Sequence, residues 1–137
     1  MRARMHHAHL FASDLDASLA FYRTWFDAEV VADTSFGGAR NVLVAVGDGR
    51  LNFYDQPPRG RGPSAVHHLG FQIEGLAGLA KRLIDAGHAR PDSLRMLDEL
   101  DYLMVEAPDG VLLELFEHKN AAGQTAGEAG WFAWPEP

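Results

Sequence analysis

An internal repeat constrains this 137-residue chain more than any other feature. HAHLFASDL (residues 7–15) can be laid over HLGFQIEGL (residues 68–76), with His7 falling on His68 and Leu15 on Leu76. At the same offset of 61 residues, Asp48-Gly49 falls on Asp109-Gly110. The identities are few, but the pattern of secondary structure around them repeats as well. The sequence therefore predicts two related modules in one chain.

Each module is expected to run strand, helix, then three strands. In the first half, Asp14 can cap a helix whose apolar stripe is Leu15, Leu19, Tyr22 and Phe26. In the second half, Leu76, Leu79 and Leu83 form the stripe of a helix that Gly87 can end. Strands are expected at residues 6–12, 29–34, 42–46, 50–55, 66–73, 102–106 and 111–117, with a poorly defined segment at 89–97.

Proline and glycine mark the boundary between the modules. QPPRGRGP (residues 56–63) predicts a linker over about 56–65, between module one at about 5–55 and module two at about 66–118. The tail, residues 119–137, ends near WFAWP, which is too aromatic to be simply solvated. We expect a single domain, with the tail packing on it or on a partner chain.

Charge and cysteine content exclude several classes of function. Lysine and arginine total 12 against 19 acidic residues, a formal charge of −7, so binding to nucleic acid or to an anionic membrane is not expected. No apolar run approaches the roughly 18 residues of a membrane span. The absence of cysteine excludes disulfides and thiolate ligands and fits the cytoplasm. Any metal must be held by nitrogen and oxygen.

Strand alternation divides the candidate residues between two faces. The mostly apolar face of each first strand should pack under its helix, which leaves His7 and His68 facing a cavity. In the last strand, Leu113 and Leu115 can join the core, so Glu114 points the other way. Alternation alone favours a solvated Glu114 on a sheet face open to water, but a carboxylate between apolar neighbours otherwise needs a partner or a metal.

The fourth strand of module one supplies the counterpart of Glu114. A strict offset of 61 would select Phe53, which belongs with the apolar residues. A slip of one residue restores the alternation and pairs Asn52 with Glu114, so Asn52 and Tyr54 should face the cavity.

Three stretches give the chain a family resemblance. HAHLFASDLDASLAFY (7–22), HLGFQI (68–73) and APDGVLLELF (107–116) resemble motifs of the vicinal oxygen chelate proteins over about residues 5–118. That superfamily includes glyoxalase I, extradiol dioxygenases, fosfomycin-resistance thiol transferases and bleomycin-binding proteins. The resemblance implies an α+β fold in which two βαβββ modules form an incomplete β-barrel around a metal cavity, commonly in a homodimer.

By position, the resemblance implies that His7, His68 and Glu114 are metal ligands. A fourth ligand, commonly glutamate, would fall at Asn52 or Tyr54, and neither replaces a glutamate well. This departure argues against a glyoxalase I reaction. Two imidazoles and a carboxylate suit divalent Fe, Mn, Zn, Ni or Co, and open positions would take vicinal oxygens of a small substrate. Dioxygenase-like or Lewis-acid chemistry is therefore expected.

Four further residues have candidate roles near the site. His9 can hydrogen-bond a ligand or move a proton, Gln72 can donate to a substrate oxygen, and Tyr102 can supply a proton. Arg40 can meet an anionic group. Each also has a plain structural reading, as a pocket wall, a solvated side chain or a surface charge.

Two classes of function remain after these considerations. The first and favoured one is a metal-dependent enzyme, within which a fosfomycin-type thiol transferase ranks lower because Arg40 is the only obvious cation for a phosphonate pocket. The second is a metal-free drug-binding protein of the bleomycin-resistance type, whose acidic charge would attract a cationic drug. The combination of His7, His68 and Glu114 counts against this second class.

Overall fold

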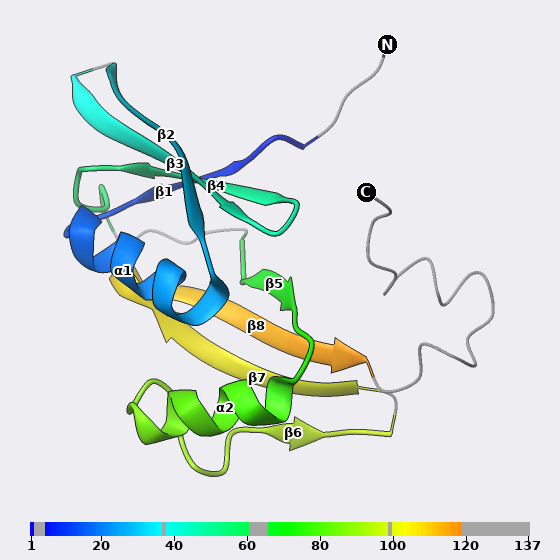
Figure 1. The fold of residues 1–137 in the computed structure, drawn as a ribbon. Coiled ribbons are helices and arrows are strands. Elements are labelled where there is room, and N and C mark those ends of the chain that lie inside the picture. Colours follow the sequence, from blue (N-terminus) through cyan, green and yellow to red (C-terminus); the bar gives the residue numbers. More distant parts are fainter. Residues whose placement is uncertain (2–4, 37, 61–65, 99, 119–137) are drawn as a thin grey trace. The chain divides into compact units, whose positions relative to one another are not determined.

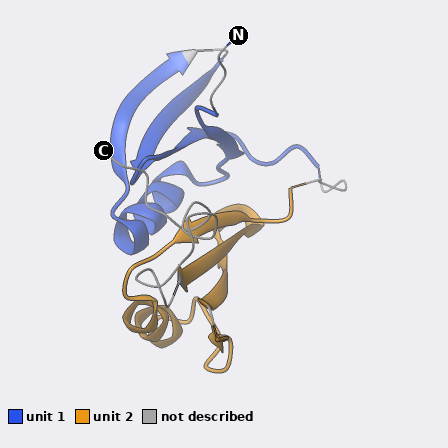
Figure 2. Ribbon diagram, turned by 90° about the vertical axis from the view of Figure 1, so that its right-hand side faces the viewer, with its two compact units in different colours: residues 1–63 blue, residues 64–137 orange. Residues whose placement is uncertain are grey.

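The chain folds into two compact units, residues 1–63 and 64–137 (Figure 2). The computed structural model describes residues 1–137 except 2–4, 37, 61–65, 99 and 119–137 (Figure 1). The predicted packing of the aromatic tail and the end of the predicted linker lie outside the described residues. No helix in the described part of the chain is long and apolar enough to cross a membrane.

Unit 1 has one helix and a four-stranded sheet in the order β1-β4-β3-β2. Its first strand pairs in parallel with β4, while the other ladders are antiparallel. The elements are β1 (Ala8–Phe11), α1 (Leu15–Phe26), β2 (Glu29–Phe36), β3 (Ala39–Val46) and β4 (Gly49–Tyr54).

The helix α1 begins and packs as its sequence predicts. The Asp14 side chain accepts a hydrogen bond from Ala17 N at 2.9 Å, which caps the first turn. The buried face of α1 includes Leu15, Tyr22 and Phe26, and the Tyr22 ring lies 5.3 Å from the ring of Phe53 on β4. The helix therefore covers the apolar face of its own sheet.

Unit 2 repeats this arrangement with the sheet order β5-β8-β7-β6. Again the first and last strands of the unit pair in parallel, and the helix packs against β7 and β8 (Figure 1). The elements are β5 (Leu69–Gln72), α2 (Leu76–Asp85), β6 (Arg95–Met96), β7 (Leu100–Ala107), the short helix η1 (Pro108–Gly110) and β8 (Val111–His118). The predicted α+β fold of two βαβββ modules is confirmed.

The N-terminus of α2 is capped by a residue that lies far from it in the sequence. Gly75 stands at its N-cap and offers no side chain, unlike Asp14 at the equivalent place in unit 1. The Glu117 carboxylate on β8 replaces the missing cap, since Oε1 accepts from Gly75 N at 2.7 Å and Oε2 from Leu76 N at 2.9 Å. Gly87 follows the helix with φ +79°, in agreement with its predicted role at the helix end.

The two hairpins explain the one-residue slip inferred from the sequence. In unit 1 the last pair before the turn is Val46 with Gly49, whereas in unit 2 it is Ala107 with Val111. The second turn is therefore one residue longer. As a result, Asn52 lies beside His9 in the β1–β4 ladder, and Glu114 lies beside Gly70 in the β5–β8 ladder. These registers confirm Asn52 as the counterpart of Glu114.

Several element boundaries differ from the predictions, among them β5, which is Leu69–Gln72 rather than 66–73, so that His67 and His68 precede it. The first strand begins at Ala8 rather than at residue 6, so both His6 and His7 precede it, and strand alternation does not assign their faces. β3 begins at Ala39, three residues before the predicted start, because its ladder with β2 continues to the pair Phe36–Ala39. β6 has only the two residues Arg95 and Met96, which fall in the segment that the sequence left undefined.

Candidate functional site

His68 and Glu114 come together in unit 2. His68 directly precedes β5, and Glu114 lies on β8, the strand paired with β5. The His68 Nε2 atom is 3.0 Å from Glu114 Oε2, and the two side chains are 33% and 31% exposed. Two predicted ligands therefore already share one partly desolvated position.

The core fixes the direction of Glu114. Its neighbours Leu113 and Leu115 are fully buried, so alternation along β8 places the carboxylate on the face away from α2. Leu112 and Phe116 share that outer face and are half-buried. The carboxylate thus stands between apolar neighbours, and His68 is the partner that reduces its desolvation cost.

Gln72 and Tyr102 lie on the same sheet face as Glu114, but not directly beside it. In the ladders, Gln72 on β5 and Tyr102 on β7 both pair with Phe116, while Met104 pairs with Glu114. They can therefore flank a ligand bound at His68 and Glu114, and their roles stay predictions.

In unit 1, His9, Asn52 and Tyr54 form a compact group. The Asn52 Nδ2 atom is 3.3 Å from His9 Nε2, and the side chain of Asn52 is buried. The His9 ring stacks on Tyr54 with centroids 4.0 Å apart and an interplanar angle of 25°. His7 lies next to this group, with its ring centroid 5.8 Å from that of His9.

This setting favours the neutral form of His9. Partial burial of the ring lowers the pKa of His9, and the nearby His7 lowers it further. Because the Asn52 amide can donate only through its nitrogen, Nε2 of His9 is the acceptor and the ring proton belongs on Nδ1. The Asn52 contact and the stacking on Tyr54 hold the orientation of a ring whose pKa is lowered.

Two further histidines were missed by the sequence reasoning. The ring of His6 meets His7 with an Nδ1–Nδ1 distance of 2.8 Å, and His67 meets His68 with the same distance. Alternation over the strand predicted at 6–12 puts His6 on the face opposite His7, which is why His6 was not a candidate. The repeated His-His dipeptide before each first strand was the signal that could have found these pairs.

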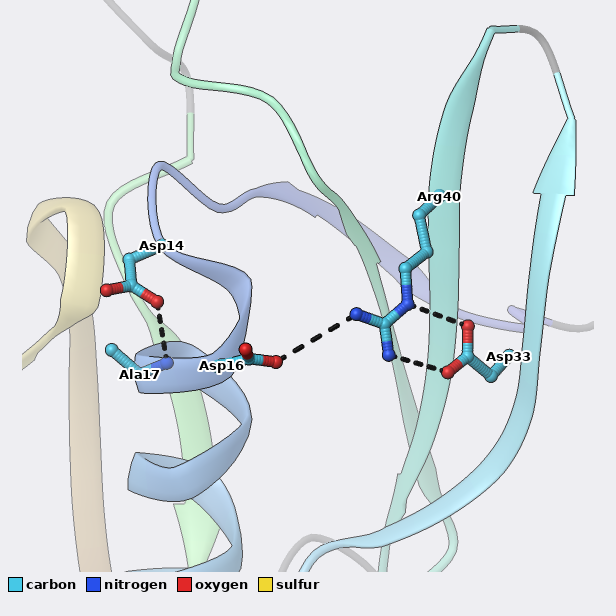
Figure 3. Close-up of polar contacts among 5 residues, drawn as sticks. All are labelled: Asp14, Asp16, Ala17, Asp33 and Arg40. Atoms are coloured by element: carbon cyan, nitrogen blue, oxygen red, sulfur yellow. Dashed lines mark hydrogen bonds and ion pairs between the residues drawn. The ribbon is translucent and has the colours of Figure 1, made fainter.

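Arg40 is held by acidic neighbours (Figure 3). Its Nε donates to Asp33 Oδ1 at 3.0 Å and its Nη2 to Asp33 Oδ2 at 2.7 Å, while Nη1 lies 3.9 Å from Asp16 Oδ1. The hydrogen bonds from Arg40 lower the pKa of Asp33. Its role in binding an anion stays a prediction, and such an anion would share the guanidinium with Asp33.

The complete predicted ligand set spans both units. Across the described ranges, no group of three or more histidine, aspartate or glutamate side chains is placed to hold a metal ion. His68 and Glu114 belong to unit 2 and His7 to unit 1, and each unit is described by itself. The triad therefore stays a prediction, of which one pair is in contact.

The chemistry of that pair fits a divalent metal. An imidazole nitrogen and a carboxylate oxygen are ligands that Fe, Mn, Zn, Ni and Co accept. Two donors that each lie about 2.1 Å from one ion, at right angles, are about 3.0 Å apart. The distance of 3.0 Å between His68 Nε2 and Glu114 Oε2 is compatible with this arrangement.

Comparison with known families agrees with the topology. Residues 4–115 match the family model of the Glyoxalase/Bleomycin resistance protein/Dioxygenase superfamily. The chain belongs to this superfamily. The predicted recognition of the vicinal oxygen chelate proteins is thus confirmed. No curated protein sequence gives a significant match.

Solved structures share the fold of this superfamily member. A glyoxalase family protein from Enterococcus faecalis has 27% identity and a TM-score of 0.65, covering 83% of this chain and 97% of its own. A glyoxylase/bleomycin resistance protein/dioxygenase domain from Frankia sp. EAN1pec has 21% identity and a TM-score of 0.70, covering 88% and 95%. A mutant of the fosfomycin resistance protein FosX from Listeria monocytogenes, crystallised with Mn(II) and 1S,2S-dihydroxypropylphosphonic acid, has 19% identity and a TM-score of 0.71, covering 88% and 95%.

Proposed function

We propose that this protein is a metal-dependent enzyme that acts on a small substrate through two vicinal oxygens. His7, His68 and Glu114 would hold the ion, with the two modules acting as one domain. The observation that carries the proposal is the 3.0 Å contact between His68 and Glu114 on the face away from the core. The Mn(II) in the FosX crystal supports divalent metal use on this fold.

The residue at the fourth-ligand position limits the type of reaction. Asn52 stands where Glu114 stands in the second unit, and its amide is engaged with His9. An amide cannot exchange a proton as a metal-bound carboxylate does, so a glyoxalase I reaction is disfavoured. Three protein ligands leave positions for two substrate oxygens, which favours dioxygenase-like or other Lewis-acid chemistry.

The residues of the chain would bind and orient the substrate around those positions. A divalent ion held there would polarise the substrate oxygens as a Lewis acid. His9 has a lowered pKa, contacts Asn52 at Nε2 and stacks on Tyr54, so its Nδ1 could donate a proton to a substrate oxygen. Gln72 and Tyr102 share the sheet face of Glu114 and can hydrogen-bond the same substrate.

Two alternatives remain as outcomes of the same tests. A fosfomycin-type reaction is supported by the FosX neighbours in fold, but the bidentate pairing of Arg40 with Asp33 argues against a free cation for a phosphonate. A metal-free drug-binding protein would leave the half-buried Glu114 without the ion that its contact with His68 suggests.

Metal analysis of untagged protein tests the proposal. Protein loaded anaerobically with Fe(II), Mn(II), Co(II), Ni(II) or Zn(II) and then desalted should retain near one ion per chain. The variants His68→Ala and Glu114→Ala should lose it, whereas His88→Ala, an exposed histidine beyond α2, should retain it. The proposal is wrong if wild-type protein retains no metal, or if His68→Ala retains as much as wild type.

Substrate screening follows metal loading. Catechols, 2-oxoaldehyde adducts and fosfomycin, each offered to the metal-loaded protein, separate the dioxygenase-like, isomerase and fosfomycin reactions. A metal-free chain that binds a bulky cationic drug would instead support the binding protein. We also expect a homodimer, which light scattering after gel filtration would detect as twice the chain mass of 15.0 kDa.

A further inference from the structure

The same histidine pair occurs in both units. His6 precedes His7 and His67 precedes His68, directly before the first strand of each unit. In both pairs the Nδ1 atoms are 2.8 Å apart. The ring centroids are 5.1 Å apart in both, with interplanar angles of 87° and 81°. This edge-on geometry is that of an N–H donor on one ring and a lone pair on the other.

The site determines which nitrogen of His68 must carry the proton. His68 Nε2 is the atom that faces Glu114, so it is the nitrogen available to a shared ion. In the metal-free contact Nε2 would donate to the Glu114 carboxylate, but a coordinating nitrogen has no proton, so in the metal-bound form the proton of a neutral His68 ring is on Nδ1. In that form the Nδ1–H would point at His67 Nδ1, which lies 2.8 Å away and would accept, with its own proton on Nε2.

We propose that His6 and His67 are positioning residues that accept a hydrogen bond from Nδ1 of His7 and His68, and so fix the tautomer and ring orientation of these two predicted metal ligands. The inference rests on the proposed metal site. It adds a role to two residues outside the ligand set. Acceptors on the second nitrogen of a ligand histidine raise its basicity and set its orientation.

The strand register explains why neighbours in sequence can fill this role. Both pairs precede the strands, since the β1 ladder starts at Ala8 and the β5 ladder at Leu69. Consecutive residues within a strand point to opposite faces, but residues before the first ladder pair are free of this constraint. The two rings of each pair can therefore meet on one side of the chain.

Metal affinity of matched variants tests the role of His67. His67→Phe keeps a ring of similar size without an acceptor, and we expect its dissociation constant for Zn(II) or Mn(II) to rise about 10- to 100-fold. His67→Asn restores an acceptor oxygen at about the place of Nδ1, and its affinity should return to within a few-fold of wild type. His88→Phe, the same exchange outside the pairs, should leave affinity unchanged. His6→Phe and His6→Asn repeat the comparison in unit 1.

Nuclear magnetic resonance of the Zn(II)-loaded protein gives a second readout that a packing role would not change. Long-range ¹⁵N–¹H spectra of the imidazoles should show His68 protonated on Nδ1 and His67 protonated on Nε2. In His67→Phe, far-ultraviolet circular dichroism should match wild type, so that a loss of affinity reports the site rather than unfolding.

The outcomes separate this inference from the proposed function. If wild-type protein binds metal and His68→Ala does not, the metal site stands. The positioning role is then overturned if His67→Phe binds as tightly as wild type, if His67→Asn binds no better than His67→Phe, or if His67 carries its proton on Nδ1 in the Zn(II) form. If wild-type protein binds no metal at all, the proposed function fails, and this inference fails with it.

Discussion

Replacing Glu117 with alanine should destabilise unit 2 by removing the cap of α2. Both carboxylate oxygens accept from free amides at the start of the helix, Gly75 N at 2.7 Å and Leu76 N at 2.9 Å. Loss of an N-cap costs about 0.5–2 kcal/mol, and loss of a negative charge at a helix N-terminus about 0.3–1 kcal/mol. Because two bonds are lost and no local side chain replaces them, we expect about 2 kcal/mol.

Urea unfolding followed by far-ultraviolet circular dichroism measures this loss. With a slope of about 2 kcal/mol per molar urea, the midpoint should fall by about 1 M. Glu117→Gln keeps one acceptor oxygen without the charge, so its loss of stability should be about half that of Glu117→Ala. Asp14→Ala, which removes the single bond to Ala17 N in unit 1, should cost about 1 kcal/mol.

A control and a local measurement complete the test. Glu106→Ala removes an exposed glutamate from β7 and should change stability by less than about 0.5 kcal/mol. Amide hydrogen exchange at Leu76 should quicken in Glu117→Ala. The reasoning is refuted if Glu117→Ala unfolds at the same urea concentration as wild type while the Leu76 amide keeps its protection.

Three further predictions follow from the described contacts. Arg40→Gln should raise the pKa of Asp33 in a ¹³C carboxyl titration, because hydrogen bonds from Arg40 lower that pKa. The contribution of this ion pair to folding stability is present above the ordinary aspartate pKa and is lost as pH falls through the lowered pKa. The ring of His9 should titrate below the ordinary histidine value of 6.5 in proton NMR, and Tyr54→Ala should raise that midpoint. Because the folded pKa is lowered, the stability linked to His9 is present above pH 6.5 and is lost as pH falls through the lowered pKa, which urea unfolding at several pH values would measure. Leu115→Ala, at a fully buried position, should cost about 2–5 kcal/mol in urea unfolding.

The parts of the fold that repeat locally could be predicted from the sequence. The cap at Asp14 and the buried positions Leu113 and Leu115 follow from short-range patterns, and each is confirmed. The pairing of Asn52 with the position of Glu114 could also be inferred, because a misplaced register would have put Phe53 on the wrong face.

The contacts between distant residues could not be predicted in this way. Glu117 caps a helix that begins about forty residues earlier, and no local sequence pattern in either segment indicates this contact. Arg40 has Asp33 as its partner because a β2–β3 hairpin turns between them. The role expected for Arg40 considered only the residue type, which cannot show whether a carboxylate already occupies the guanidinium.

The parallel pairing that closes each unit has a consequence for the order of folding. The antiparallel ladders join strands that follow one another along the chain, so they close short loops and can form early. The parallel ladders β1–β4 and β5–β8 close only after the helix and the intervening strands are in place. The His9–Asn52 contact lies on the first of these closing ladders, and the His68–Glu114 contact lies at the start of the second. A chain that stalled just before closure would keep most of its sheet and lack both contacts, so ligand binding would report completion of folding rather than secondary structure content.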